Sequence, residues 1–360
     1  MGLPRSKYVK EGEEGVYHCY TRCVRRAFLC GFDPLTGKDF SHRKKWFEDR
    51  LRYLASIFAV DVINYSVMAT HSHNILRTRP DLVASWSDLD IAARWLELCP
   101  QTSRSKKKPI PPLEQQIRAL ADCPQSIAVL RKRLCSLSWF MAQLNQFIAR
   151  KANMEDNVKG RFWESRFKCQ ALLDEAAIAA CMVYVDLNPI RAGIASTPED
   201  SDFTSIQQRI RSWQKNPAPP AGNESLQPKD IVNVTLPPPE PASAANPSFC
   251  SSDSADSWLC PIQSDSRRRG ILQMSEIEYF DLVDRSGRMI RSDKRGFIEA
   301  GLEPILNRIG AIPKAWGETV SHFGSSFRLA AGRFARMREF ADRLDKHWFQ
   351  GLSAARAAFM

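Results

Sequence analysis

The alternation of hydrophobic and polar residues predicts a strand, a helix and one or two further strands early in the chain. Residues 16–24 (VYHCYTRCV) are rich in aromatic and β-branched residues, which is typical of a strand. Residues 42–60 repeat apolar side chains at the spacing of an amphipathic helix. The apolar stretch 61–77 predicts one or two strands, interrupted near Thr70.

The patterns that follow predict two helices and a fourth strand. Residues 125–152 form a long amphipathic segment, and residues 158–173 look extended. A helix is expected over 174–187, and Asn188-Pro189 ends it because proline disfavours a helical conformation in the residue before it. Four strands with packing helices predict an α+β fold with one sheet and one helical layer.

Proline marks a boundary after this region. Nine of the 22 prolines lie in residues 216–247, a composition typical of an extended linker. We therefore expect a first domain over 1–212, a proline-rich linker over 213–250 and a small, mainly helical accessory region over 251–360. No chemical motif is evident in the last region, but it carries basic clusters such as residues 267–269, so it is either a helical accessory region or a DNA-contacting one.

Composition and charge narrow the class of partner. The chain has 360 residues, 44% hydrophobic and 25% charged, which excludes a disordered or collagen-like protein. Lys and Arg outnumber Asp and Glu by 51 to 40, and residues 1–200 carry 30 against 22. Nucleic acid is therefore the first partner to consider, ahead of an acidic membrane surface.

Neither a membrane-spanning segment nor a signal peptide is apparent, because no stretch approaches about 18 consecutive apolar residues and the N-terminus has no apolar core. Ten cysteines occur without a C-x-x-C pair, so they are expected to be buried hydrophobic residues. We expect a cytoplasmic protein.

His71 and His73 are the first candidates for chemistry. Side chains alternate along a strand, so both imidazoles project from the same face, about 6 to 7 Å apart. Two neutral imidazoles can share one metal ion and leave positions open to substrate. The alternative is a solvent-exposed polar strand end.

Tyr184 and Asn188 are the second candidates, four residues apart on one helix face. A tyrosine hydroxyl has a pKa near 10 and attacks poorly unless a cation assists. The Asn188 carbonyl oxygen could complete a His, His, Asn metal site beside it. The alternative is a tyrosine that packs in the core and an asparagine that ends a helix.

The segment GRFWESRFK (160–168) interleaves cations with aromatic rings. Arg161, Arg166 and Lys168 could bind phosphates, while Trp163 and its neighbouring phenylalanines could stack on unpaired bases. A half-buried strand with a basic outer face has the same composition, so both interpretations stay open.

The order and spacing of these motifs resemble a known family. YHCYTRCVRRAFL (17–29), the strand ending in M-x-x-His-x-His (68–73), GRFWESRFK (160–168) and YVDLNPIRAGI (184–194) are similar to the HUH-type single-tyrosine transposases, in particular the REP-associated tyrosine transposase branch. The resemblance spans about residues 15–205. The element Tyr-x-x-x-Asn-Pro-Ile-Arg-Ala-Gly is its most specific part.

This resemblance implies a ferredoxin-like antiparallel sheet, which would lie in the HUH-type catalytic domain of 1–212, and a DNA transposase activity. His71, His73 and Asn188 would bind magnesium or manganese, and Tyr184 would be the nucleophile. The substrate would be single-stranded DNA with hairpin ends, cut through a 5′-phosphotyrosine and rejoined by a later strand attack. A homodimer is expected, and no nucleotide cofactor, since G-x-x-x-x-G-K-[ST] is absent. The expected DNA-binding residues are Arg22, Arg161, Trp163, Arg166, Lys168 and Arg191.

One position departs from the family pattern. Ser72 lies between the histidines, where family members usually have a bulky hydrophobic residue. A buried hydroxyl without a partner would cost about 1 to 3 kcal/mol. Two alternatives to an active transposase therefore stay in view: a weakly active or inactive DNA-binding regulatory descendant, and an unrelated ferredoxin-like RNA-binding module.

Overall fold

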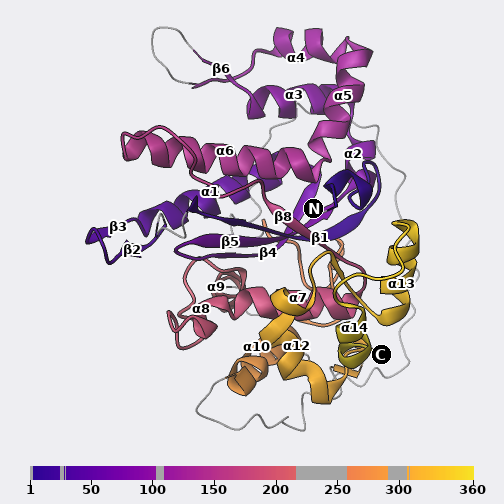
Figure 1. Ribbon diagram of the computed structural model, residues 1–360. Helices are drawn as coiled ribbons and strands as arrows, with labels where there is room; N and C mark the ends of the chain where they lie inside the picture. Colours follow the sequence, from indigo (N-terminus) through magenta and orange to yellow (C-terminus); the bar gives the residue numbers. More distant parts are fainter. Residues whose placement is uncertain are drawn as a thin grey trace, which may run out of the picture.

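A mixed sheet of five strands runs through the middle of the protein (Figure 1). In strand order it contains β4 (Val60–Val67), β5 (His71–Thr78), β1 (Gly15–Arg22), β8 (Lys168–Leu172) and β9 (Ala330–Ala331). The first four pair antiparallel, and β9 pairs in parallel with β8. This computed structural model describes residues 3–24, 28, 30–102, 109–215, 258–290, 306–307 and 309–360.

This architecture is compatible with the predicted α+β class. The expectation of a wholly antiparallel sheet is wrong at β9, which is contributed from beyond the proline-rich segment. Two residues are too few to produce a pattern of alternation in the sequence. Two small hairpins complete the strands, β2 (Phe32–Asp33) with β3 (Lys38–Asp39) and β6 (Gln101–Thr102) with β7 (Pro109–Ile110).

Helices cover both faces of the large sheet (Figure 1). One face carries α1 (His42–Ile57) and α6 (Leu137–Glu155), which pack against each other. The other face carries α7 (Glu175–Asp186) and α9 (Ser205–Lys215), with α8 (Asn188–Arg191) following α7. None of the helices in the described ranges is long and apolar enough to cross a membrane.

The region between β5 and β8 is more divided than the sequence predicts. It contains α2 (Pro80–Ser85), α3 (Asp88–Leu98), α4 (Glu114–Ala121), α5 (Pro124–Leu134) and then α6. The single amphipathic segment expected over 125–152 is two helices, because the Ser136 side chain caps α6 by accepting from the Trp139 amide. The extended segment expected over 158–173 is a strand only from Lys168 onward.

The residues after the proline-rich segment form helices, as expected, and pack against the sheet layer. They form α10 (Glu276–Ile290), a 3-10 turn η3 (Pro313–Ala315), α12 (Trp316–Ser326), α13 (Phe334–Arg343) and α14 (Leu352–Ala358); a short 3-10 turn η1 (Arg5–Lys7) precedes β1. Arg77 donates to the carbonyl oxygens of Arg269 and Gly270, and Arg209 donates to those of Ile63 and Cys260. Residues 216–257, most of the predicted linker, lie outside the described part, and the domain boundaries stay predictions.

A buried carboxylate on α7 joins four elements. Asp186 Oδ2 accepts from the Tyr279 hydroxyl of α10 at 2.5 Å and from the Asn64 amide of β4 at 3.1 Å. Its Oδ1 accepts from the Ser205 hydroxyl at 2.8 Å and the Ile206 amide at 3.2 Å, both in α9. The side chain is fully buried. These bonds fix α7 relative to the sheet.

Removal of this carboxylate should strongly destabilise the fold. We expect Asp186→Ala to lower the free energy of unfolding by at least about 3 kcal/mol, because several buried donors lose their acceptor together. Tyr279→Phe removes one donor and should cost about 1.5 to 3 kcal/mol. Urea unfolding followed by circular dichroism measures both.

The matched control is Asp122→Ala, since Asp122 is an exposed residue after α4. It should change stability by no more than about 0.5 kcal/mol. A loss at Asp186 no larger than that at Asp122 would show that the buried carboxylate does not hold these elements together.

Candidate functional site

Alternating residues of three neighbouring strands converge on the face of the sheet covered by α7. On β1 and β5, Tyr20 is opposite His73, and on β1 and β8, Tyr20 is opposite Lys168. Successive side chains of a strand point to opposite faces, so every second residue counted from Tyr20, His73 and Lys168 lies on this face. The set is His18, Tyr20, Arg22, His71, His73, Lys168 and Gln170, and all seven line one pocket of about 340 Å³.

Tyr184 reaches the same pocket from α7. It is half-buried, whereas its neighbours on the helix are buried. Its ring centroid lies 5.8 Å from that of His73 and 6.1 Å from that of His18. The centroids of His71 and His73 are 5.0 Å apart. The two histidines and the tyrosine singled out in the sequence therefore meet, although about 110 residues separate them.

A chain of hydrogen bonds orients His73. Gln170 Nε2 donates to the Phe327 carbonyl oxygen at 2.6 Å, which leaves Gln170 Oε1 to accept from His18 Nδ1 at 3.2 Å. Neutral His18 then accepts at Nε2 from His73 Nδ1, 2.8 Å away. This assignment of protons follows from the chain of partners. It leaves His73 Nε2 with a lone pair for a ligand.

Burial keeps these histidines neutral. It lowers the pKa of His18 to about 4. Burial also lowers the pKa of His71 to about 4, with smaller contributions from the charges of Arg22 and Arg191. The pKa of His73 is held well below its ordinary value, first by burial and then by the neighbouring histidines. Neutral imidazole is the form that binds metal ions.

The Ser72 hydroxyl has a partner. Ser72 projects to the opposite face of the sheet from the histidines, and its Oγ lies 2.9 Å from Thr21 Oγ1. The two residues are directly opposite each other on β5 and β1. The cost considered for an unpaired hydroxyl at this position therefore does not arise.

Asn188 is bonded to a cation. Its Oδ1, the atom expected to bind metal, accepts from Arg191 Nη2. The Arg191 guanidinium also lies 4.1 Å from the centroid of the Tyr184 ring and donates to the Ser321 carbonyl oxygen at 3.1 Å. Asn188 Nδ2 is buried without a hydrogen-bond partner in the described part of the chain. A metal role for Asn188 stays a prediction.

The donor set fits a metal ion held by two imidazoles. His73 has Nε2 available. His71 Nδ1 lies 3.0 Å from Thr70 Oγ1, and in the tautomer in which Nδ1 donates to that hydroxyl its Nε2 is available too. Within the described ranges, no group of three or more His, Cys, Asp or Glu side chains is arranged to hold a metal. A third protein ligand would have to be an oxygen such as that of Asn188, in competition with Arg191.

The C-terminal residues form one wall of the pocket. Gly324 of α12 faces the Tyr184 hydroxyl so closely that a Cβ added there would lie 2.7 Å from it. Phe327 lines the pocket as well. The sequence motifs gave no sign of either residue, or of His18 and Gln170. His18 and Gln170 could have been found from the strand register, because both lie on the same face of the sheet as His73.

The predicted DNA-binding residues differ in where they lie relative to the pocket. Arg22 and Lys168 are exposed at the pocket, Arg166 lines an adjoining groove, and Arg161 is exposed outside the pocket lining. Trp163 packs inward: its ring centroid is 5.9 Å from that of Phe47, and its Nε1 donates to the Asn145 carbonyl oxygen. Whether these residues bind DNA stays a prediction.

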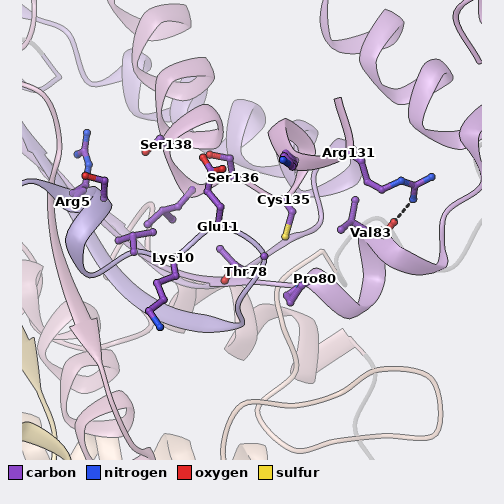
Figure 2. A pocket seen from close by; sticks show the side chains of 15 residues that line it. Arg5, Lys10, Glu11, Thr78, Pro80, Val83, Arg131, Cys135, Ser136 and Ser138 are labelled. Carbon is purple, nitrogen blue, oxygen red and sulfur yellow. Dashed lines mark hydrogen bonds between the residues drawn. The ribbon is translucent and has the colours of Figure 1, made fainter. Parts of the chain in front are cut away.

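Another cavity, of about 500 Å³, has little potential for chemistry (Figure 2). It lies between the N-terminal segment and the helices α5 and α6. Arg131, at its edge, donates to the carbonyl oxygens of Val83 and Trp86 and forms an ion pair with Asp88. Burial raises the pKa of the Cys135 thiol to about 11, so it is not a reactive thiolate.

Comparisons with known proteins leave the family open. No family model matches the chain, and no curated protein matches it. One solved structure that is similar is of a REP-associated tyrosine transposase bound to a REP hairpin. The match has 12% sequence identity and a TM-score of 0.31, and it covers 59% of this chain and 86% of the other. A TM-score at this level does not establish a common fold.

Proposed function

We propose that this protein is a single-strand DNA transposase that cuts and rejoins DNA beside a hairpin, with Tyr184 as its nucleophile. The observation that carries the proposal is the convergence of Tyr184, His71 and His73 in one pocket. A nucleophile, two neutral imidazoles that can hold a metal ion and a cationic rim are groups that can support phosphodiester cleavage through a covalent intermediate.

The topology supports this proposal. A helix connects β1 to β4, a helical region connects β5 to β8, and the order β4-β5-β1-β8 is antiparallel throughout. We infer from these connections a ferredoxin-like β-α-β-β-α-β unit, with β9 added at its edge. The motif resemblance to the REP-associated tyrosine transposases predicts this same unit.

In the reaction, Tyr184 Oη attacks the phosphorus and forms a tyrosyl–phosphate bond, while the bond from phosphorus to the 3′-oxygen breaks. The tyrosine proton is lost to solvent, and the leaving 3′-oxygen takes up a proton. Arg22 and Lys168 bind the phosphate at the rim. His71 and His73 would hold a divalent ion, which acts as a Lewis acid on the phosphate. A later 3′-hydroxyl reverses the reaction and releases Tyr184.

A single chain supplies both the histidines and the tyrosine. The proposal therefore does not require a second subunit to complete the site, and the homodimer implied by the motifs stays a separate prediction.

The contact between Arg191 and Asn188 favours a second function, DNA binding without cleavage. Arg191 holds the Asn188 oxygen and covers one side of the Tyr184 ring. If this arrangement persists with DNA bound, the third metal ligand is blocked. The protein would then bind hairpin DNA as a regulator without cutting it.

Loss of the nucleophile should abolish covalent chemistry and leave binding intact. We expect Tyr184→Phe to form no covalent protein–DNA adduct, whereas the unaltered protein forms one that requires manganese or magnesium. The assay uses labelled single-stranded hairpin DNA from the flanks of the gene, denaturing gels and a chelator control.

Tyr20→Phe is the matched control, since Tyr20 lines the same pocket. Its adduct should persist. An adduct that depends on Tyr20 would reassign the nucleophile, and hairpin binding by every variant without any adduct would favour the regulatory function.

The hydrogen-bond chain should tune metal binding. We expect His18→Phe to weaken manganese binding by about 10- to 100-fold, because His73 loses the acceptor that fixes its protonated nitrogen. His18→Gln keeps an acceptor and should recover part of the affinity. Calorimetric titration of Mn²⁺ measures this directly, with exposed His42→Gln as the control. Equal affinity in His18→Phe and the unaltered protein would contradict the proton assignment.

Close packing at Gly324 gives a further test. Gly324→Ala should keep or raise the melting temperature, since alanine is favoured over glycine in a helix by about 1 kcal/mol. It should nevertheless reduce the rate of adduct formation, because the new methyl group displaces the Tyr184 hydroxyl. Unchanged cleavage would show that the hydroxyl position is not critical.

A further inference from the structure

A groove of about 1150 Å³ continues from the Tyr184 pocket. The two share Tyr20, Ser165, Lys168 and Gly324. Most of the lining comes from four segments: residues 3–8, residues 165–169 at the start of β8, residues 324–329 at the end of α12, and residues 346–350 between α13 and α14. Tyr20 of β1 and Ser138 of α6 complete it. Its volume exceeds the range of about 300 to 1,000 Å³ that is typical of small-molecule sites.

Every charged side chain in the lining of the groove is positive. Its lining contains five cations and no Asp or Glu: Arg5, Arg166, Lys168, Arg328 and Lys346. None of the five forms an ion pair with another residue that the structure describes. Their charges are therefore not neutralised from within the described protein, and a polyanion is the ligand that fits.

An exposed indole lies in the same lining. Trp348 is 69% exposed, an unusual position for so large an apolar ring. The two residues that follow it hold this segment in place. The adjacent Phe349 packs on Phe340 with centroids 6.0 Å apart, and Gln350 Nε2 donates to the Ser325 carbonyl oxygen at 2.6 Å, next to Gly324.

We propose that this groove binds the single-stranded DNA that flanks the cleavage position, with phosphates on the cations and a base stacked on Trp348. Cations along a groove with an exposed aromatic ring are the two elements of single-strand binding. Continuity with the pocket favours DNA as the occupant. The inference rests on the proposed function, and it names the C-terminal residues that would contact DNA, which the sequence did not identify.

The test compares two DNA probes with the full-length protein. One is a blunt DNA hairpin, and the other carries an oligothymidine tail of about ten nucleotides, within the site sizes of single-strand grooves. Tails on the 5′ and the 3′ side are tested separately, and affinity is measured by fluorescence anisotropy. We expect the unaltered protein to bind one tailed probe more tightly than the blunt one.

Trp348→Ala should weaken binding of that tailed probe by about 5- to 150-fold and leave the blunt probe unchanged. Lys346→Ala and Arg328→Ala should each reduce the slope of log K against log salt by about 0.7. Phe32→Ala, at a residue 57% exposed on the β2–β3 hairpin, and Arg118→Ala on α4 are matched controls that should change neither value.

Equal binding of tailed and blunt probes, or a Trp348→Ala variant that binds the tail as well as the unaltered protein, would overturn the inference. An oligouridine tail bound more tightly than oligothymidine would overturn the choice of DNA. The covalent adduct assay separates the two proposals. If an adduct forms but Trp348→Ala binds the tail normally, the proposed function holds and the groove inference fails. If tail binding depends on Trp348 but no adduct forms, the groove inference holds and the proposed DNA cleavage fails.

Discussion

The position of α7 depends on the buried carboxylate of Asp186. Burial raises its pKa, so the cost of desolvating the charge exceeds the gain from its hydrogen bonds. The carboxylate nevertheless receives four donors, from β4, α9 and α10. Asp186 is two residues from Tyr184, so the network that fixes the helix also fixes the tyrosine over the sheet. A network of this kind constrains orientation more than it adds stability.

Short-range patterns predicted only part of the candidate site. The strand carrying His71 and His73 and the helix carrying Tyr184 follow from alternation and helical periodicity, and the resemblance to a known family paired them. His18 and Gln170 require knowledge of which strands are neighbours and in which register, and that depends on the tertiary fold. Gly324, Phe327 and β9 could not be predicted, because the contacts that place them join residues more than 130 positions apart.

The sequence also does not show which aromatic side chains are buried and which are exposed. In GRFWESRFK the sequence shows aromatic residues beside cations, but Phe162 and Phe167 are buried and Trp163 packs on Phe47. Trp348 lies in no recognisable motif and is exposed. Which ring can stack on a base is decided by the neighbours that cover it. Ser72 illustrates the same point, because its hydroxyl is acceptable in a packed layer only through Thr21 on the adjacent strand.

Neutral and charged side chains lie at different depths in the site. His18 and His73 at the floor are buried, His71 is half-buried, and burial lowers the pKa of all three. The cations at the rim include four exposed residues, Arg22, Arg166, Lys168 and Arg328. Arg191 lies between these layers, and the acceptors that it contacts are an amide oxygen and backbone carbonyls, which leave its charge intact. Its field reaches the floor, since it lowers the pKa of His71. Under the proposed function, a phosphate in the pocket would meet positive charge from the rim and from Arg191, with Glu164 the one acid among the described lining residues. His71 and His73 would then hold the metal ion.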